Sequence, residues 1–347
     1  MDRAQTAASC CSSPADRQLE HMDQQRTNLP DIRNYRPGDA EAWLALIRAC
    51  PDFDEHFFNR CPSLDSLRLV IEHPNMDARK NLFFAGSRPT FSGYAELWCA
   101  SDQPRAVGRV LVRPDQRHRG LGSALLQRIE ERAQAVGSHY LDISIAEAQP
   151  NGRRFLEGHG FAAVHYCWQM ELSPLHDLPS PQWPQGYRAR AFVVGQDEQA
   201  TVELENASFG DEWEYVPILV GEIEGFCRSA SFKPEGVILA ERDGQLVGDC
   251  WNWIDDARIA QTGQTQGAVW SLCVLPQHRG LGLGRALLLE GLQWLRAQGM
   301  ASAVGGVDGA NERAQHLYKS LGCQVVRTDI WYRKPLAAAH PRPPDLP

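Results

Sequence analysis

The chain has 347 residues, with 35 basic and 43 acidic side chains and a formal net charge of −8. Hydrophobic residues make up 43% and charged residues 22%, which is typical of a soluble globular protein with about two domains. The acidic balance argues against a nucleic-acid-binding surface, and no apolar run approaches the roughly 18 residues that span a bilayer.

Residues 1–28 predict a disordered tail without the apolar core of a secretory signal, and Met22 is an alternative start. The ten cysteines form no CxxC pair, so we expect reduced thiols in the cytoplasm. The eleven histidines show no HxxxH or HExxH spacing, so we expect no metal site.

Residues 29–172 predict one α/β unit. It begins with a strand and an amphipathic helix over residues 32–47, with Asp39 near the helix start, followed by a hairpin over residues 81–98. An apolar strand then leads through a glycine loop into a helix that ends at Gly137, as a C-cap does. A further strand, a short helix and a final strand complete the unit.

Residues 173–186 contain four prolines and predict an extended, semi-rigid linker. Residues 187–335 then repeat the same order of elements, with Asp197 near the first helix and a strong turn signal at Asp243-Gly244. Residues 336–347 predict a C-terminal tail.

The two units are copies of one another. Residues 106–161 align without a gap with residues 268–323 at an offset of 162, and the second copy has seven extra residues in the preceding loop. The anchor pairs are Val112/Val274, Pro114/Pro276, Arg117/Arg279, Gly120/Gly282, Gly122/Gly284, Leu125/Leu287, Gly137/Gly299 and Gly160/Gly322. The sequence therefore predicts an α/β fold in duplicate, with a mixed sheet in each copy.

Each copy has a glycine-rich loop between a strand and a helix, RHRGLG from Arg117 and RGLGLG from Arg279. Such a loop presents free backbone N–H groups at the positive end of the helix dipole, and glycine lets an anion approach them. A Walker lysine and the sixth-position glycine of a dinucleotide fingerprint are both missing, so neither of those nucleotide sites is predicted. A tight turn without a ligand remains the alternative.

The loop at Arg279 resembles the acyl-coenzyme A loop of the GNAT superfamily of N-acyltransferases, whose pattern is [QR]xxGx[GA]. The segment from Val307 to Cys323 is similar to the family's NxxAxxLYxxxGF segment. The resemblance covers about 150 residues in each half, and the tandem arrangement resembles the architecture of mycothiol synthase.

The resemblance implies that acetyl-CoA binds to the second copy as a co-substrate. The strand would pair with the pantetheine arm and the loop would hold the pyrophosphate. Asn311 would lie beside the pantetheine, and Tyr318 would protonate the leaving thiolate. The implied contact residues are Leu272, Cys273, Val274, Arg279, Gly280, Leu281, Gly282, Leu283, Gly284 and Arg285 in the second copy, with Arg117, Gly120 and Gly122 in the first.

The general base stays open among Asp249, Glu222, Asp308 and a water relay. Residues 268–271 carry no carboxylate where many relatives have a glutamate, which argues against a mycothiol-type substrate. Cys273 lies between apolar residues and is better explained by core packing than by an acyl-cysteine intermediate. The aromatic and acidic residues of the segment 205–217 either line an acceptor pocket for a cationic amine or form a solvated loop.

The first copy differs at the positions that carry chemistry. Leu156 stands in place of Tyr318, and a leucine cannot donate a proton. The first copy also has Gln149 for Asn311, Gly152 for Ala314 and His118 for Gly280. We therefore expect the second copy to catalyse and the first to be a structural or regulatory partner.

The sequence thus predicts an N-acetyltransferase that acts on a primary amine of a small molecule by direct attack, with a monomer favoured. The alternatives are a protein or peptide acetyltransferase, a transferase of longer acyl groups, and an acyl-CoA sensor without turnover.

Overall fold

The computed structural model describes residues 30–50, 62–100 and 103–336, so the predicted tails lie outside it, apart from Leu336. In the first half, the helices are α2 (Ala40–Arg48), α3 (Leu64–Ile71), α4 (Ala78–Asn81), α5 (Leu121–Ala135) and α6 (Pro150–Gly158). The strands of this half are β1 (Ile32–Asn34), β2 (Leu82–Ser87), β3 (Thr90–Cys99), β4 (Arg105–Val112), β5 (Tyr140–Ala146) and β6 (Ala162–Leu172).

The second half repeats this order. Its helices are α7 (Glu198–Phe209), α8 (Val220–Cys227), α9 (Asp256–Thr262), α10 (Leu283–Ala297) and α11 (Glu312–Ser320). Its strands are β7 (Tyr187–Ala191), β8 (Val237–Arg242), β9 (Gln245–Ile254), β10 (Gln266–Val274), β11 (Ser302–Asp308) and β12 (Gln324–Pro335).

The duplication that the sequence predicts is confirmed by the helix bounds. Helices α5 and α10 both have 15 residues and start 162 positions apart, and the residue before each, Gly120 or Gly282, has a φ of 85°. The extra residues of the second copy form α9. The turn at Asp243-Gly244 has positive φ at both residues, as a two-residue hairpin loop requires.

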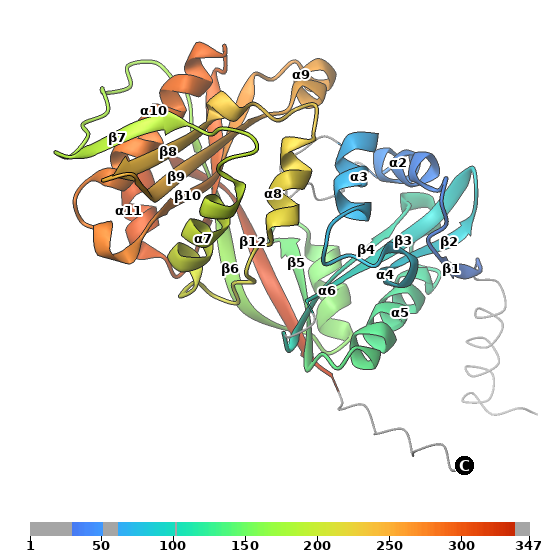
Figure 1. Cartoon of the computed structure of the whole chain (residues 1–347). Coiled ribbons are helices and arrows are strands. Elements are labelled where there is room, and N and C mark those ends of the chain that lie inside the picture. Colours follow the sequence, from blue (N-terminus) through green and yellow to red (C-terminus); the bar gives the residue numbers. More distant parts are fainter. Residues whose placement is uncertain (1–29, 51–61, 101–102, 337–347) are drawn as a thin grey trace, which may run out of the picture.

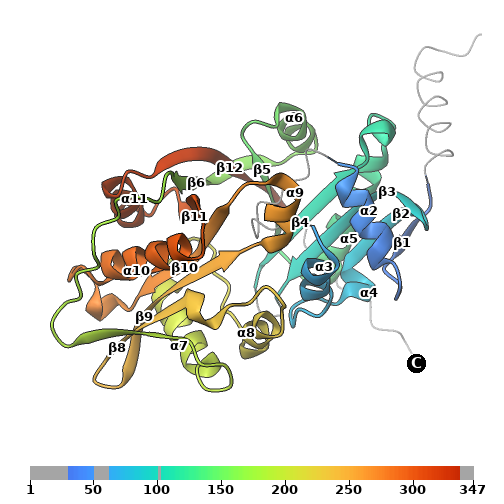
Figure 2. The same cartoon turned by 90° about the horizontal axis from the view of Figure 1, so that it is seen from above.

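The strands of the described residues join in one twelve-stranded sheet in the order β1-β2-β3-β4-β5-β12-β6-β11-β10-β9-β8-β7. The pairs β4–β5 and β10–β11 are parallel and the others are antiparallel, which confirms the mixed α/β fold. The two halves lie side by side, with α3 of one facing α8 of the other (Figure 1). Figure 2 shows the same pair of helices between the halves from above.

The last strands of the two copies are exchanged. Strand β6 is the last strand of the first copy in sequence but pairs with β11 of the second, over residues 167–172. Strand β12 is the last strand of the second copy but pairs with β5 of the first, over residues 329–335. Since β6 and β12 also pair with each other, the hydrogen bonds of the sheet run continuously from one half into the other.

Helices cover both faces of each half-sheet, so the central strands are apolar on both sides. In the second half, Ile238 and Cys250 pack with α10, whereas Leu239 and Trp251 pack in the cluster beside α7 and α8. The first half repeats this division between α5 and α2. Among the described residues, no helix is both long and apolar enough to cross a membrane.

The two aspartates predicted near helix starts are confirmed, and both accept the same set of hydrogen bonds. Asp197 precedes α7 and accepts hydrogen bonds from the Val193 N–H at 2.7 Å and from both terminal nitrogens of Arg190 at 2.6 and 2.8 Å. Asp39 precedes α2 and is held in the same way by Arg36 and Arg33. Each pair ties the first strand of a copy to its first helix.

Cutting the chain in the linker should not separate the halves, because β6 and β12 each pair across the junction. A specific protease site inserted after the exposed Ser180 provides the cut. Size-exclusion chromatography should show one species of unchanged size, which splits into two fragments only in denaturant. Fragments that elute separately under native conditions would contradict the exchanged-strand fold.

Candidate active site

The site in the second copy begins where β10 and β11 separate. Residues 266–269 of β10 pair with residues 302–305 of β11, and the ladder then stops although both strands continue. The pairing of β10 with β9 shifts at the same place, between Val269 and Ser271. Beyond Gly305 the facing edges of β10 and β11 therefore form a fork, whose backbone groups are available to an extended ligand.

The predicted glycine loop lies at the open end of this fork. Gly280 and Gly282 have φ values of 79° and 85°, a left-handed conformation that favours glycine. A Cβ at either position would meet nothing within 4 Å, so the space beside the backbone is open. Since the first N–H groups of α10 have no partner inside the helix, the loop can hold an anion.

The two loop arginines have a structural role that sequence reasoning did not predict. The Arg279 Nε donates to the Val274 carbonyl at 2.9 Å, and its Nη2 donates to the Ser208 carbonyl at 2.6 Å. Arg117 bonds the Val112 carbonyl in the same way in the first copy. Each arginine thus closes the loop onto the end of its strand. Arg285 donates to the Ser320 hydroxyl at 2.9 Å.

Tyr318 lies at the apex of the fork. Its hydroxyl oxygen is 3.3 Å from the point where a Cβ of Gly305 would stand, and Gly305 belongs to the last pair of the ladder. The residue is 6% exposed, and burial raises the pKa of the phenol, with smaller contributions from Cys250 and Cys323. At neutral pH the hydroxyl therefore keeps its proton and can donate it into the fork.

Asn311 caps the helix that carries Tyr318. Its Oδ1 accepts from the Ala314 N–H at 2.9 Å, and its Nδ2 donates to Glu212 Oε1 at 2.7 Å. Burial, followed by the charge of Asp308, raises the pKa of Glu212. The side chain of Asn311 is thus held at the edge of the fork by two hydrogen bonds.

The three carboxylates proposed as bases lie in different places. Glu222 pairs with His73 of the first half, with 3.1 Å between Oε2 and Nε2. Asp308 accepts from His165 at 2.8 Å and from the Ala310 N–H at 2.6 Å. Asp249 is fully buried on β9 beside β10.

Sequence reasoning missed Glu205 as a member of this group. The residue lies on the buried face of α7, and burial, followed by the charge of Asp249, raises its pKa well above the usual value. A glutamate among buried positions of a helix, at the spacing of Thr201 and Ser208, is the signal that would have found it.

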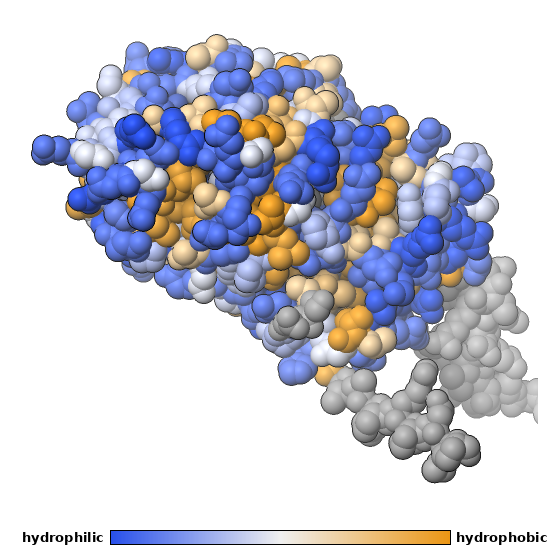
Figure 3. Space-filling view, viewed as in Figure 1, coloured by the Kyte–Doolittle hydropathy of each residue, from blue (hydrophilic) through white to orange (hydrophobic). Residues whose placement is uncertain are grey.

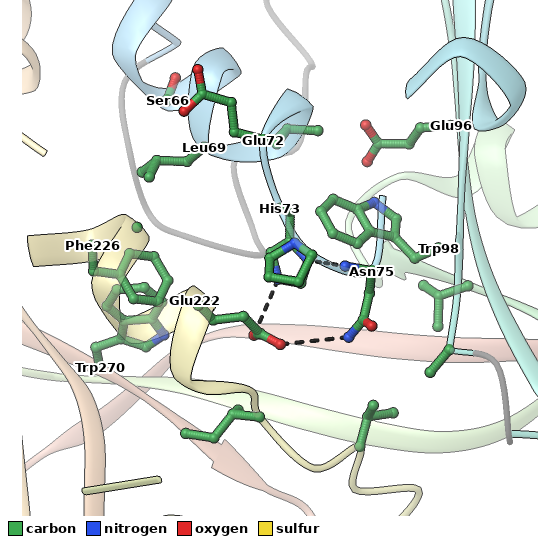
Figure 4. A pocket seen from close by; sticks show the side chains of 18 of the residues that line it. Ser66, Leu69, Glu72, His73, Asn75, Glu96, Trp98, Glu222, Phe226 and Trp270 are labelled. Carbon is green, nitrogen blue, oxygen red and sulfur yellow. Dashed lines mark hydrogen bonds and ion pairs between the residues drawn. The ribbon is translucent and has the colours of Figure 1, made fainter. Parts of the chain in front are cut away.

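A cavity of about 930 Å³ lies between the halves and reaches the fork at Ser271. It is lined by both copies, including Glu96 and Trp98 of β3 and Glu222 and Phe226 of α8. Figure 4 shows His73 and Asn75 reaching across to Glu222, with Trp270 against Phe226 on the far wall. Apolar side chains show between polar ones where the halves meet (Figure 3).

Most of the aromatic and acidic side chains of the segment 205–217 line this cavity, but one packs elsewhere. Phe209, Glu212, Glu214 and Tyr215 line the cavity. Trp213 instead stacks on His165, with 4.2 Å between ring centroids.

The first copy has the same kind of fork, since β4 and β5 pair only over residues 105–107 and 140–142, but its apex is filled by apolar side chains. Leu156, in the place of Tyr318, is 3% exposed and packs in the core with Ile143, which stands where the second copy has Gly305. The loop itself survives, since Gly120 keeps its left-handed φ and His118 takes a φ of 60° in place of Gly280. A Cβ at Gly122 would contact the Phe155 ring at 3.4 Å.

Three side chains at the strand exchange could hold a metal ion, although none is predicted from the sequence. The candidate ligand atoms of His165, Cys167 and Asp308 all lie within 4.8 Å of one another. Burial raises the pKa of the Cys167 thiol to about 11, so the thiolate is scarce at neutral pH. In the described structure the His165–Asp308 hydrogen bond uses two of the three groups.

Comparison with curated proteins gives relatives along most of the chain. A mycothiol acetyltransferase of Thermobispora bispora is 33% identical over 299 residues, covering 86% of this chain and 97% of its own. The same enzyme of Streptomyces avermitilis is 32% identical, covering 86% and 92%. These relatives match both halves and the linker between them.

Solved structures give the same picture of the fold. A GCN5-related N-acetyltransferase from Sphaerobacter thermophilus has a TM-score of 0.64 and 25% identity, covering 88% of this chain and 95% of its own. A tandem GNAT protein from the clavulanic acid biosynthesis pathway has a TM-score of 0.66 and 18% identity, covering 89% and 99%. The pattern of the acetyltransferase (GNAT) family matches residues 46–161 and again residues 198–323. The chain is therefore a tandem member of the GNAT acetyltransferase family.

Proposed function

We propose that the second copy transfers an acetyl group from acetyl-CoA to a primary amine of a small molecule by direct attack. The observation that carries the proposal is the Tyr318 hydroxyl at the apex of an open fork, with a left-handed glycine loop at the other end. The first copy keeps the loop but has Leu156 and Ile143 at the apex.

The acyl donor would lie along the fork. The pyrophosphate would rest on the N–H groups of residues 280–285, and the pantetheine arm would pair with the inner edge of β10 over residues 272–274. The thioester would then lie near Gly305, within reach of the Tyr318 hydroxyl. No metal takes part in this arrangement.

The reaction requires two proton transfers besides the attack. The amine nitrogen bonds to the thioester carbon and loses a proton, and the carbon–sulfur bond breaks. The departing thiolate takes the proton of the Tyr318 hydroxyl, for which a neutral phenol is well suited. The phenolate regains a proton from solvent when the product leaves.

The cavity between the halves supports a small-molecule acceptor. A volume of about 930 Å³ is in the upper range for sites that enclose a compound of drug size. Because the relatives are named mycothiol acetyltransferases, we propose mycothiol without its acetyl group, here desacetyl-mycothiol, as the first acceptor to test. Residues 268–271 carry no carboxylate, which argued against a mycothiol-type substrate. Desacetyl-mycothiol as the acceptor therefore requires that another residue supply the base.

Other features of the proposal follow from the chain itself. The described cysteines are Cys50, Cys99, Cys167, Cys227, Cys250, Cys273 and Cys323, and all are free thiols, in line with the cytoplasm. The exchange of β6 and β12 supplies within one chain the pairing that would otherwise need a second subunit, which supports a monomer.

Glutamate at Gly282 should block acetyl-CoA binding in the second copy, because the side chain brings bulk and negative charge to the proposed pyrophosphate site. We expect calorimetric affinity for that site to fall at least ~100-fold, since like charges at close range near a protein surface cost about 4 kcal/mol. Acetyl transfer to desacetyl-mycothiol should be lost.

Gly120→Glu is the matched control, because Gly120 has the same φ and the same open surroundings, so the backbone strain is equal. Transfer should survive in this variant. The reverse pattern would assign catalysis to the first copy, and wild-type binding without transfer to any small amine, peptide or longer acyl donor would indicate a sensor.

Removing the hydroxyl of Tyr318 should slow the reaction without weakening donor binding. For Tyr318→Phe we expect kcat to fall by about 10²–10⁴, the usual contribution of a general acid, and the acetyl-CoA Kd to stay within about twofold. Tyr332→Phe removes another buried hydroxyl, bonded to Glu157 in the first half, and should keep the wild-type rate. Equal rates in both variants would exclude Tyr318 as the acid.

A further inference from the structure

A pair of buried carboxyl groups, Glu205 and Asp249, lies beside the fork and has no role in the reaction described above. Glu205 comes from α7 and is 9% exposed, whereas Asp249 comes from β9 and is fully buried. Asp249 stands opposite Cys273 of β10, and Trp251 stands opposite Ser271. The pair therefore lies between α7 and the strand that forms one edge of the fork.

The polar atoms around this pair are poorly satisfied. Trp251, Ser271 and Cys273 lie close enough to Asp249 to lower its pKa as hydrogen-bonding neighbours. Within the described part of the chain, however, the Asp249 carboxylate oxygens, the Ser271 hydroxyl and the Trp251 indole N–H all lack a partner of good geometry. Nearly all buried polar groups in folded proteins are hydrogen-bonded. Several such atoms in one place indicate a site that a proton, water or a ligand completes.

The electrostatic surroundings keep the two carboxyls from ionising together. Burial raises the pKa of Asp249 to about 7, and burial and then Asp249 raise the pKa of Glu205. The other titratable groups that act on the pair are Glu222, Tyr215 and Cys273, and none of them is a cation. Because both pKa values are raised, the two carboxyls retain a proton between them toward neutral pH and lose it as the pH rises.

Only one member of the pair faces the substrate space. Glu205 lines the cavity between the halves together with Ser271, whereas Asp249 lies behind it, away from the cavity lining. Ser271 lies two positions beyond Val269, the last residue of β10 that pairs with β11. Glu205 therefore reaches the fork from the cavity side, and Tyr318 reaches its apex from α11.

We propose that Glu205 is the general base of acetyl transfer. Asp249 is a positioning residue, whose negative charge sets how strongly Glu205 binds a proton. This assignment rests on the proposed function. It supplies the carboxylate that residues 268–271 lack, from a helix instead of from the strand.

The step balances with the groups present. The Glu205 carboxylate takes one proton from the amine as the carbon–nitrogen bond forms. The carbon–sulfur bond then breaks, and Tyr318 protonates the coenzyme A sulfur. Glu205 gives its proton to solvent, and the Tyr318 phenolate takes one from solvent when the product leaves, which restores both groups.

The test compares Glu205→Gln with Glu203→Gln, which makes the same change at an exposed position of the same helix. The measurement is kcat against pH with saturating acetyl-CoA and desacetyl-mycothiol. In wild type, kcat should rise with pH as the pair loses its proton. In Glu205→Gln, kcat should fall about 10²–10⁴-fold and lose this rise, while the acetyl-CoA Kd stays within about twofold. Glu203→Gln should match wild type.

Asp249→Asn checks the positioning role. Removing the neighbouring negative charge should lower the pKa of Glu205, so the rise in kcat should move to lower pH while part of the rate remains. A purely structural role would lower the melting temperature without moving the pH profile. If Glu205→Gln does not fold, Glu205→Asp keeps the charge but withdraws it by one methylene, and should give a folded, slow enzyme.

Each failure has a distinct signature. If Glu205→Gln and Glu203→Gln have equal rates, the base assignment is wrong but the proposed function stands. The same conclusion follows if the rise of kcat with pH persists in Glu205→Gln but disappears in His73→Gln. A wild-type protein that binds acetyl-CoA but acetylates no amine overturns the proposed function, and the base assignment falls with it.

Discussion

The early end of the ladder between β10 and β11 is the constraint on which the site depends. The two strands share four residue pairs and then separate, whereas β11 remains paired with β6 on its other side over six residues. The outer strand holds β11 in place while β10 departs toward β9. Because backbone groups are costly to leave unpaired, a fork of this kind persists only where water or a ligand completes it.

The exchange of β6 and β12 explains why both halves are needed to build this fork. The strand that holds β11 comes from the first copy in sequence, so the second copy cannot complete its own sheet. The two halves also meet at α3 and α8, where the Ser229 hydroxyl donates to Asp65, and the cavity lies between them. The first copy thus supplies one wall of the cavity and one strand of the second half's sheet, even without a tyrosine at the apex of its own fork.

Local features of the fold could be predicted from the sequence, because a few residues decide them. Gly280 and Gly282 dictate the left-handed turn, Gly299 marks the end of α10, and the offset of 162 carries the same turns into the first copy. The strand exchange could not be predicted, because β6 and β12 have equivalent positions in the repeat and either could close either sheet. Pairing between distant segments leaves no local signal.

The candidate site was predicted only in part, for related reasons. The glycine loop follows from its spacing and Tyr318 from the resemblance of its segment to a family motif. The partners of Arg279, the carbonyls of Val274 and Ser208, are revealed by no residue pattern. Glu205 escaped notice because an acid on a helix is usually exposed. The role proposed for Glu205 depends on its proximity to Asp249, which results from the packing of α7 on β9.

Hydrogen–deuterium exchange with and without acetyl-CoA tests most directly the claim that the fork of the second copy holds the acyl donor. The account predicts that the ligand slows exchange at the amides of residues 272–285, on the inner edge of β10 and in its loop. The corresponding amides of residues 110–123 should change much less. Protection confined to residues 110–123, with none at 272–285, would contradict it.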